Sequence, residues 1–454
     1  MLDVSGGLSS GSRWHRWDPH IHAPGTLLNN QFGGNDCWNE YFSAIESLVP
    51  TVRAIGVTDY YLLDLYERVR REKDAGRLPE CDLVFPNVEM RLTIGTARGS
   101  RVNIHLLVSP DDPNHVAELK RFLRRLTFKA YNDTFCCSDE DLERLGRCAG
   151  IQSPDAAVRH GATQFKVAFE ELREAFYDHA WATSNILVAV AAGTNDGTSG
   201  LRDAADATQR AEVEKFADII FSSNANDREY WLGRRALGLE QIQDRYGGLK
   251  PCLHGSDAHD VSSVGAPEGD RFTWIKGAPI FDSLRQACIV PESRAFVGNT
   301  PPMGATPSQV ISRVAVVAAP WVTTPTVELN PGLVAVIGAR GSGKTALADI
   351  IAAGCDAGPE VANSQSFLNR AREHLHGASV RVDWVTPEYA ERSLTPLNHS
   401  PTFIHVRGTF RNNLSKNYVP QTGSPTRSSP RLRGSSLKRT TRALATARST
   451  SRNF

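Results

Sequence analysis

Between about residues 13 and 305, strand-like apolar runs alternate with segments of helical spacing. Strand-like runs cover 53–59, 83–89, 102–108 and 185–191, and amphipathic helical spacing lies between most of them. This alternation is typical of α/β proteins with a parallel sheet or barrel. In such barrels the ends of strands that are distant in sequence meet at one mouth, where the chemistry lies. We therefore predict an α/β fold in which polar strand ends converge.

Two histidines, His20 and His22, lie in the first strand-like segment. Side chains alternate faces along a strand, so both imidazoles leave the same side of the sheet. Two imidazoles in this arrangement can bind one metal ion. A single His-x-His pair also occurs in surfaces and cores without any metal. The pair therefore indicates a metal site only if polar residues at other strand ends lie close to it.

Several acids and histidines end or interrupt the later strand-like runs. Each has an ordinary structural alternative: Asp59 could cap a helix, Glu89 could face solvent, and His105 could be a buried core histidine. Their occurrence on one alternating pattern favours a shared site. The full set is His20, His22, Asp59, Glu89, His105, Asp257 and His259.

These residues form motifs that resemble those of the PHP (polymerase and histidinol phosphatase) superfamily. The matching elements are His20-Ile-His22, Thr58-Asp59, Glu89, His105 and Ser256-Asp257-Ala258-His259. The resemblance implies a distorted β/α barrel with a phosphoesterase site for two or three metal ions. The metal ligands that it implies are His20, His22, Glu89, His105, Asp257 and His259. The catalytic residues that we predict are Asp59, His254 and Asp257.

A narrower resemblance, over about residues 13–410, is to the TrlF-like proteins, which join an N-terminal PHP domain to an ABC/SMC-type ATPase. It rests on the segments 17–26, 56–60 and 253–260. It implies a phosphoesterase domain at 1–305 and the N-terminal part of a P-loop NTPase domain at 306–410. It also implies nucleic acid as substrate, a role in DNA repair or anti-phage defence, and a homodimer for the complete relative.

The chain departs from the PHP pattern at three places. Tyr60 replaces a usual histidine, Ala191–Gly193 replaces a His-Pro pair, and 27–33 lacks the usual acid. Asp59, His254 or Asp196 could compensate for these losses. One or two metal ions are therefore expected in place of three.

The expected chemistry is metal-assisted attack of water on phosphorus. Mixed histidine and carboxylate ligands suit Mn²⁺, Fe²⁺ or Zn²⁺ better than Mg²⁺. Three alternatives stay open: an amidohydrolase that cuts C–N bonds, a small-molecule phosphatase, and a degenerate PHP domain that serves as a nucleotide-gated regulatory module.

A complete G-x-x-x-x-G-K-[ST] motif follows a proline-rich linker near 301–307. The apolar run 333–337 predicts a strand before the loop, and a helical pattern follows it. The glycines let backbone N–H groups face phosphate, Lys344 neutralises it, and Thr345 can bind Mg²⁺. No later apolar run ends in the acid that hydrolysis needs. We predict ATP binding with Mg²⁺, without turnover, by Gly338, Gly341, Ser342, Gly343, Lys344 and Thr345.

The composition, with 22% charged and 41% hydrophobic residues, is ordinary for a soluble globular protein, and the cysteine pattern leads us to expect a cytoplasmic one. No apolar run approaches the roughly 18 residues of a membrane-spanning helix. The 8 cysteines show no Cys-x-x-Cys spacing, so we expect them to be reduced.

The last segment, 411–454, contains Ser, Thr, Arg and Pro but no acid. This composition predicts disorder. A basic tail can bind nucleic acid, but a frameshift is the favoured interpretation. With suitable codons, the shifted frame from Ser424 encodes an acidic amphipathic helix that resembles the TrlF-like continuation.

Overall fold

The computed structural model describes residues 12–202, 205–302, 304, 306–357 and 364–395, together with the backbone of 403–406. The predicted tail, 411–454, lies outside these residues. The described part contains no helix that is both long and apolar enough to cross a membrane.

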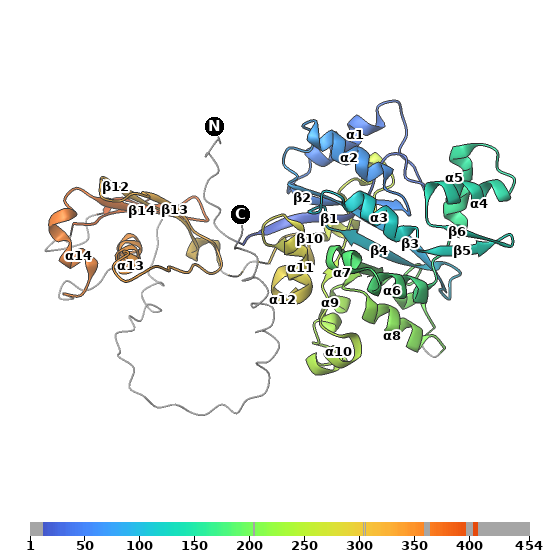
Figure 1. Cartoon of the computed structure of the whole chain (residues 1–454). Coiled ribbons are helices and arrows are strands. Elements are labelled where there is room, and N and C mark those ends of the chain that lie inside the picture. The colour runs from blue at the N-terminus through green and yellow to red at the C-terminus, as the bar shows by residue number, and fades with distance from the viewer. Residues whose placement is uncertain are drawn as a thin grey trace, which may run out of the picture.

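A nine-stranded mixed sheet forms the larger part of the structure (Figure 1). Its strand order is β11-β10-β1-β2-β3-β4-β7-β8-β9. The edge strands β9 and β11 lie close together, so the sheet nearly closes into a barrel. The strands are β1 (Trp14–His22), β2 (Val52–Tyr60), β3 (Leu83–Gly95), β4 (Arg101–Val108), β7 (Ile186–Ala191), β8 (Ile219–Phe221), β9 (Cys252–Leu253), β10 (Phe272–Lys276) and β11 (Ala295–Gly298).

The sheet is mixed, whereas the alternating pattern of the sequence is typical of a parallel one. β4 pairs antiparallel with both β3 and β7, and β10 pairs antiparallel with β1 and β11. For β4 the reason is the short turn 96–100 that joins it to β3, because two neighbouring strands joined by a tight turn run antiparallel. β1, β2, β3, β7, β8 and β9 still run parallel to one another, so their carboxyl ends meet at one mouth.

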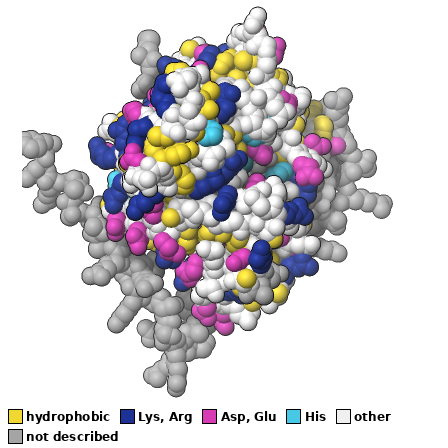
Figure 2. Space-filling model, turned by 90° about the vertical axis from the view of Figure 1, so that its right-hand side faces the viewer, with side chains coloured by type: hydrophobic (Ala, Val, Ile, Leu, Met, Phe, Trp, Pro, Cys, Tyr) yellow, Lys and Arg dark blue, Asp and Glu magenta, His cyan; other side chains and the backbone are white. Residues whose placement is uncertain are grey.

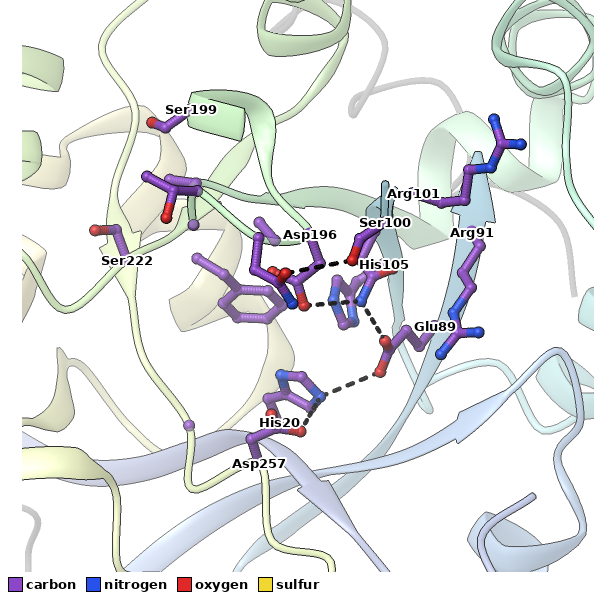
Figure 3. Close-up of a pocket in the computed structure, with 18 of the residues that line it drawn as sticks. His20, Glu89, Arg91, Ser100, Arg101, His105, Asp196, Ser199, Ser222 and Asp257 are labelled. Atoms are coloured by element: carbon purple, nitrogen blue, oxygen red, sulfur yellow. Dashed lines mark hydrogen bonds and ion pairs between the residues drawn. The ribbon is translucent and has the colours of Figure 1, made fainter. Parts of the chain in front are cut away.

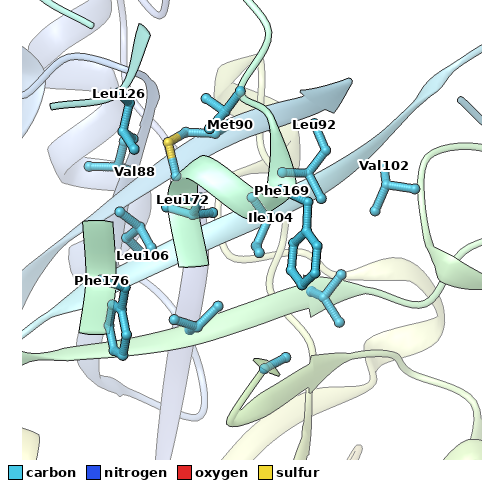
Figure 4. Packing of buried hydrophobic residues seen from close by; sticks show 14 of the residues in the cluster. Val88, Met90, Leu92, Val102, Ile104, Leu106, Leu126, Phe169, Leu172 and Phe176 are labelled. Carbon is cyan, nitrogen blue, oxygen red and sulfur yellow. The ribbon is translucent and has the colours of Figure 1, made fainter. Parts of the chain in front are cut away.

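Helices cover the outside of the sheet (Figure 1). Helix α6 packs its apolar residues against Val88, Met90, Ile104 and Leu106 of the sheet (Figure 4). The helices of this part are α1 (Cys37–Glu46), α2 (Asp64–Asp74), α3 (His115–Leu123), α4 (Asp139–Cys148), α5 (Pro154–Gln164), α6 (Phe169–Tyr177), α7 (Ala180–Asn185), α8 (Ala207–Phe216), α9 (Ala225–Trp231), α10 (Leu239–Tyr246), α11 (Phe281–Ile289) and α12 (Pro291–Arg294). A hairpin of β5 (Thr127–Ala130) and β6 (Asp133–Cys136) precedes α4.

The inside of the barrel is apolar at one end and polar at the other. Phe281 and Leu284 of α11 belong to a buried cluster with Phe85 of β3 and Leu107 of β4. Along β3 the same face then carries Asn87, Glu89 and Arg91, and along β4 it carries His105, Asn103 and Arg101. The apolar floor therefore fixes the strands, and the next residues on the same face become the polar mouth.

A second, five-stranded sheet has the order β13-β12-β14-β15-β16, and every pair in it is antiparallel. The helix α13 (Lys344–Gly354) packs on it, with Gly354 against Val382. The strands are β12 (Ile311–Val317), β13 (Thr326–Glu328), β14 (Ser379–Trp384), β15 (Tyr389–Ser393) and β16 (Phe403–Val406), and a short helix α14 (Phe367–Arg370) precedes β14.

The predicted strand at 333–337 is absent from this sheet, so that prediction is wrong. The segment is irregular, and Leu333 and Ile337 are each 88% exposed. A strand needs hydrogen-bonded neighbours, and no described residue pairs with this segment.

Truncation of a core side chain tests the packing of the barrel wall. Leu106 of β4 is fully buried, so we expect Leu106→Ala to lower the free energy of unfolding by about 2–5 kcal/mol. Leu239→Ala is the matched control, because Leu239 is 60% exposed and its truncation should cost less than about 0.5 kcal/mol. Urea denaturation measures both, and equal losses would contradict the assignment of Leu106 to the core.

Candidate metal centre

The two histidines of β1 occupy the mouth of the barrel as the period of a strand predicts. Their Nε2 atoms lie 3.3 Å apart. His22 is fully buried, and its Nδ1 lies 3.0 Å from the Thr26 hydroxyl. Thr26 Oγ1 in turn donates to Asp59 Oδ1 at 3.0 Å. Because the carboxylate takes the hydroxyl proton, Nδ1 of His22 must donate to Thr26, so Nε2 is the nitrogen through which His22 would bind a metal ion.

Glu89 reaches the same point from β3 (Figure 3). Its buried Oε2 lies 3.3 Å from His20 Nε2 and 3.5 Å from His22 Nε2, and has no hydrogen-bond partner of good geometry. Its Oε1 accepts a hydrogen bond of 2.7 Å from Asn103 Nδ2. Burial works to raise the pKa of Glu89, but the contacts with His20 and His22 lower it well below its usual range. Glu89 is therefore an anion.

Asp257 enters from the loop after β9. Its Oδ1 lies 3.2 Å from His20 Nε2 and 3.4 Å from His22 Nε2. A side chain at Gly255 would place Cβ 2.5 Å from the His20 carbonyl oxygen, so this position needs glycine for the loop to lie on β1. Asp257 itself has a φ of 49°, a strained backbone of the kind that functional residues tolerate.

His259 completes the cluster from the same loop. Its ring stacks on that of His22 with centroids 4.2 Å apart, and its Nε2 lies 3.5 Å from Asp257 Oδ1. His259 Nδ1 is buried without a hydrogen-bond partner among the described residues.

This geometry fits a metal ion. Ligand atoms bound to one ion at about 2.1 Å lie roughly 3.0–3.4 Å apart at octahedral or tetrahedral angles. The measured distances of 3.2–3.5 Å between the histidine nitrogens and the two carboxylates match this spacing. The donor atoms form two triads that share one member, His20/His22/Glu89 and His22/Asp257/His259. The burial of Glu89 Oε2 without a good hydrogen bond is the expected state of a ligand atom.

The predicted ligand His105 lies beside the triads and belongs to neither. Its ring centroid is 4.7 Å from that of His20, and its Nδ1 lies 3.2 Å from Asn87 Oδ1. Asn87 Nδ2 donates to the Pro19 carbonyl, so its oxygen faces His105 and accepts from Nδ1. Burial lowers the pKa of His105 to about 3, so the ring is neutral with Nε2 free to bind.

Asp59, which the sequence predicts to be catalytic, is not among the residues that line the cavity. Tyr60, its neighbour on β2, lines the cavity, and side chains alternate along a strand. Asp59 Oδ1 accepts hydrogen bonds from Thr26 Oγ1, Leu27 N and Tyr60 N. Burial raises its pKa to about 6. It is therefore linked to His22 by two hydrogen bonds through Thr26.

His254, the other predicted catalytic group, does line the cavity. Its Nδ1 lies 3.0 Å from the Arg271 carbonyl oxygen and must donate to it, since a carbonyl only accepts. Burial lowers the pKa of His254, so the ring is neutral with an unprotonated Nε2.

The residues at the departures from the PHP pattern also line the cavity. Tyr60 stacks on His22 at 5.4 Å between centroids, and burial raises its pKa, so the phenol stays neutral. Ala191 and Gly193 offer no side-chain ligand, whereas Asp196, in the following turn, lines the cavity as an acid.

The cavity has a volume of about 1000 Å³, and histidine side chains lie in a recess beside Lys and Arg side chains (Figure 2). Sequence reasoning missed several polar residues of its wall. Three of them keep the two-residue period of Glu89 on β3 or of His105 on β4, a signal that could have found them. They are Arg91, Arg101 and Asn103.

The predicted nucleotide loop lies in the smaller part of the structure. Gly341 and Gly343 have φ values of 88° and 87°, which glycine adopts readily, and α13 begins at Lys344. Lys344 Nζ donates to the carbonyl oxygens of Gly338 and Ala339. No contact that would assign a role to Ser342 or Thr345 is seen in this part of the chain.

No family model matches the chain, and no curated protein matches it. Among solved structures, a proposed metal-dependent phosphoesterase from Bifidobacterium adolescentis ATCC 15703 is similar, with 10% identity and a TM-score of 0.30. The match covers 60% of this chain and 96% of that one.

Removal of the Thr26 hydroxyl tests the positioning of His22. Thr26→Val keeps the shape but breaks the chain from Asp59 to His22, so we expect the affinity for Mn²⁺ or Zn²⁺ to fall about 10–100-fold. Titration against a chelator of known affinity measures this. Thr183→Val, at an exposed site on α7, is the matched control and should leave affinity unchanged. Unchanged affinity in folded Thr26→Val would exclude the positioning role.

Proposed function

We propose that the barrel is a metal-dependent phosphoesterase that acts on nucleic acid. The observation that carries this proposal is the convergence of three histidines and two carboxylates, with ligand spacing, at the mouth of a polar cavity. The ligands would be His20, His22, Glu89, Asp257 and His259, and His105 is suited to hold a second ion. The mixture of nitrogen and oxygen donors suits Mn²⁺, Fe²⁺ or Zn²⁺.

A bound divalent ion would supply Lewis acidity and a lowered pKa for water. The protein residues have complementary tasks. Glu89 and Asp257 bring two negative charges that hold the pKa of His22 up at about 9 without metal, so the site attracts cations. Burial by itself would lower the pKa of His22, but the contacts with the two carboxylates raise this pKa by more than burial lowers it. His254, neutral with a free Nε2, can accept a proton at the cavity wall.

The metal requirement gives a direct test of activity. With Mn²⁺, the full chain should hydrolyse a chromogenic phosphodiester and labelled DNA or RNA, and EDTA should abolish the reaction. His20→Ala and Asp257→Ala should each reduce kcat/KM by more than about a hundredfold. Mutation of a residue that only hydrogen-bonds a metal ligand can already reduce activity about a hundredfold, and these two variants would remove ligands themselves.

The matched controls are His160→Ala and Asp244→Ala, which lie outside the cavity. They should keep wild-type activity. Metal found by elemental analysis in the wild type, without hydrolysis of any of these substrates, would instead favour the second candidate.

The second candidate is a degenerate PHP domain that serves as a regulatory module. It is favoured by one observation: Tyr60, Ala191 and Gly193 line the cavity where the PHP pattern has ligands. A cavity with fewer ligands could bind metal and substrate without turnover.

We further propose that Gly338–Thr345 binds ATP with Mg²⁺ as a nucleotide module of the ABC/SMC type, and that complete relatives dimerise through it. The left-handed glycines and the start of α13 at Lys344 support a phosphate cradle.

Binding of ATP should fall by roughly tenfold or more in Lys344→Ala, because a charged contact to phosphate is lost. Lys215→Ala, an exposed lysine of α8, is the control. Equal binding of a fluorescent ATP analogue by both variants would contradict the cradle.

A further inference from the structure

Basic residues continue the row of metal ligands along the inner faces of β3 and β4. Glu89 lies opposite His105, Arg91 lies opposite Asn103, and Arg101 lies opposite Gly95 after a shift in register. Side chains two residues apart share a face about 7 Å apart. Arg91 and Arg101 therefore line the cavity one and two such steps beyond the ligand pair (Figure 3).

Lys166 joins the two arginines from the segment between α5 and α6. The amide of Val167 donates to the Arg91 carbonyl at 2.9 Å, and Val167 accepts from Thr93 N at 2.8 Å. These bonds fix Lys166 beside Arg91. Its Nζ donates to the carbonyls of Thr163 and Phe165. Burial and the charges of Arg91 and Arg101 lower the pKa of Lys166 to about 8.

No carboxylate in the described chain lies within ion-pair distance of these three cations. The two acids on this wall contact other groups: Glu89 lies against His20 and His22, and Asp196 accepts a hydrogen bond from Asn103 at 3.4 Å. Three positive charges on one cavity wall repel one another, and a bound anion would relieve that repulsion. The fold holds them together through strand pairing, not through acidic partners.

The wall that carries Arg101 is also fastened in place. The turn between β3 and β4 contacts the segment after β7: Thr96 Oγ1 donates to the Asn195 carbonyl at 2.8 Å, and Ser100 Oγ donates to Asn195 Oδ1 at 3.3 Å. Asn103 bridges Glu89 and Asp196. The basic residues are therefore held at a set position relative to the metal ligands.

We propose that Arg91, Arg101 and Lys166 form a second anion subsite, which binds a phosphate of the substrate other than the one that is hydrolysed. The inference rests on the proposed function, because the scissile phosphate is taken to lie at the metal ligands. The favoured substrate class is then an oligonucleotide, whose regularly spaced phosphates can occupy both places. A single phosphate monoester would leave the subsite empty.

Binding without catalysis tests the subsite separately from the activity. A 3′-labelled, 5′-phosphorylated trinucleotide is titrated with the full chain in EDTA, and fluorescence anisotropy is measured over a range of salt. Arg91→Gln, Arg101→Gln and Lys166→Gln should each weaken binding roughly tenfold. Each should also reduce the slope of log affinity against log salt by about 0.7, the value for one contact to a single strand.

Lys129→Gln, an exposed lysine of β5, is the control and should keep the wild-type slope. The same trinucleotide with a 5′-hydroxyl separates the two sources of the phosphate. If the wild type binds the 5′-hydroxyl form more weakly than the 5′-phosphorylated form, and the three variants bind both forms equally, the terminal phosphate occupies the subsite. If the wild type binds both forms equally, an internal phosphodiester occupies it.

Absent binding by the wild type, or unchanged slopes in all three folded variants, would overturn the subsite. Binding with the expected slopes but no hydrolysis with Mn²⁺ would leave the subsite standing and overturn the proposed activity. The two failures are therefore distinguishable.

Discussion

The buried carboxylate of Asp18 joins β1 to the loop after β9 and thereby brings together the ligands that these two segments carry. It accepts from the backbone N–H and the hydroxyl of Ser256, at 3.0 and 2.6 Å, and from the N–H of His20 at 3.3 Å. Asp257 N in turn donates to the His20 carbonyl at 2.8 Å. Burial works to raise the pKa of Asp18, and the hydrogen bonds from Ser256 offset part of this cost. The loop after β9 is thereby fixed on β1, so that Asp257 meets His20 and His22.

The other residues of the mouth are positioned by the alternation of side chains along β3 and β4. The inner faces of β3 and β4 change from apolar to polar within a few residues, from Phe85 to Glu89 and from Leu107 to His105. The apolar half packs around α11 and holds the strands rigidly, which suits a site that must keep ligand atoms at set distances. Asn87 and Thr26 each fix one histidine with Nδ1 protonated, so hydrogen bonds within the sheet choose the ligand nitrogen.

Much of this arrangement could be predicted from the sequence, because it depends on local patterns. Apolar runs that end on acids or histidines located five of the six proposed ligands in two adjoining triads. The direction of Asp59 was missed, although Tyr60 is in phase with the inner face and Asp59 is not. Other features depend on contacts distant in sequence: the pairing of β1 with β10, the antiparallel five-stranded sheet, and the approach of Lys166 to Arg91. Local pattern holds no information on such partners.

The same distinction separates the glycine loop of the smaller part from the strand expected before it. The cradle is local, since Gly341, Gly343 and the first turn of α13 adopt their conformations within a few residues. The strand expected before it is not local, because 333–337 would need a partner strand on each side to pair its backbone and cover Leu333 and Ile337. An acid that positions water for hydrolysis would also come from such a neighbouring strand. The glycine loop therefore forms from local contacts alone, whereas the strand expected before it does not form in the described chain.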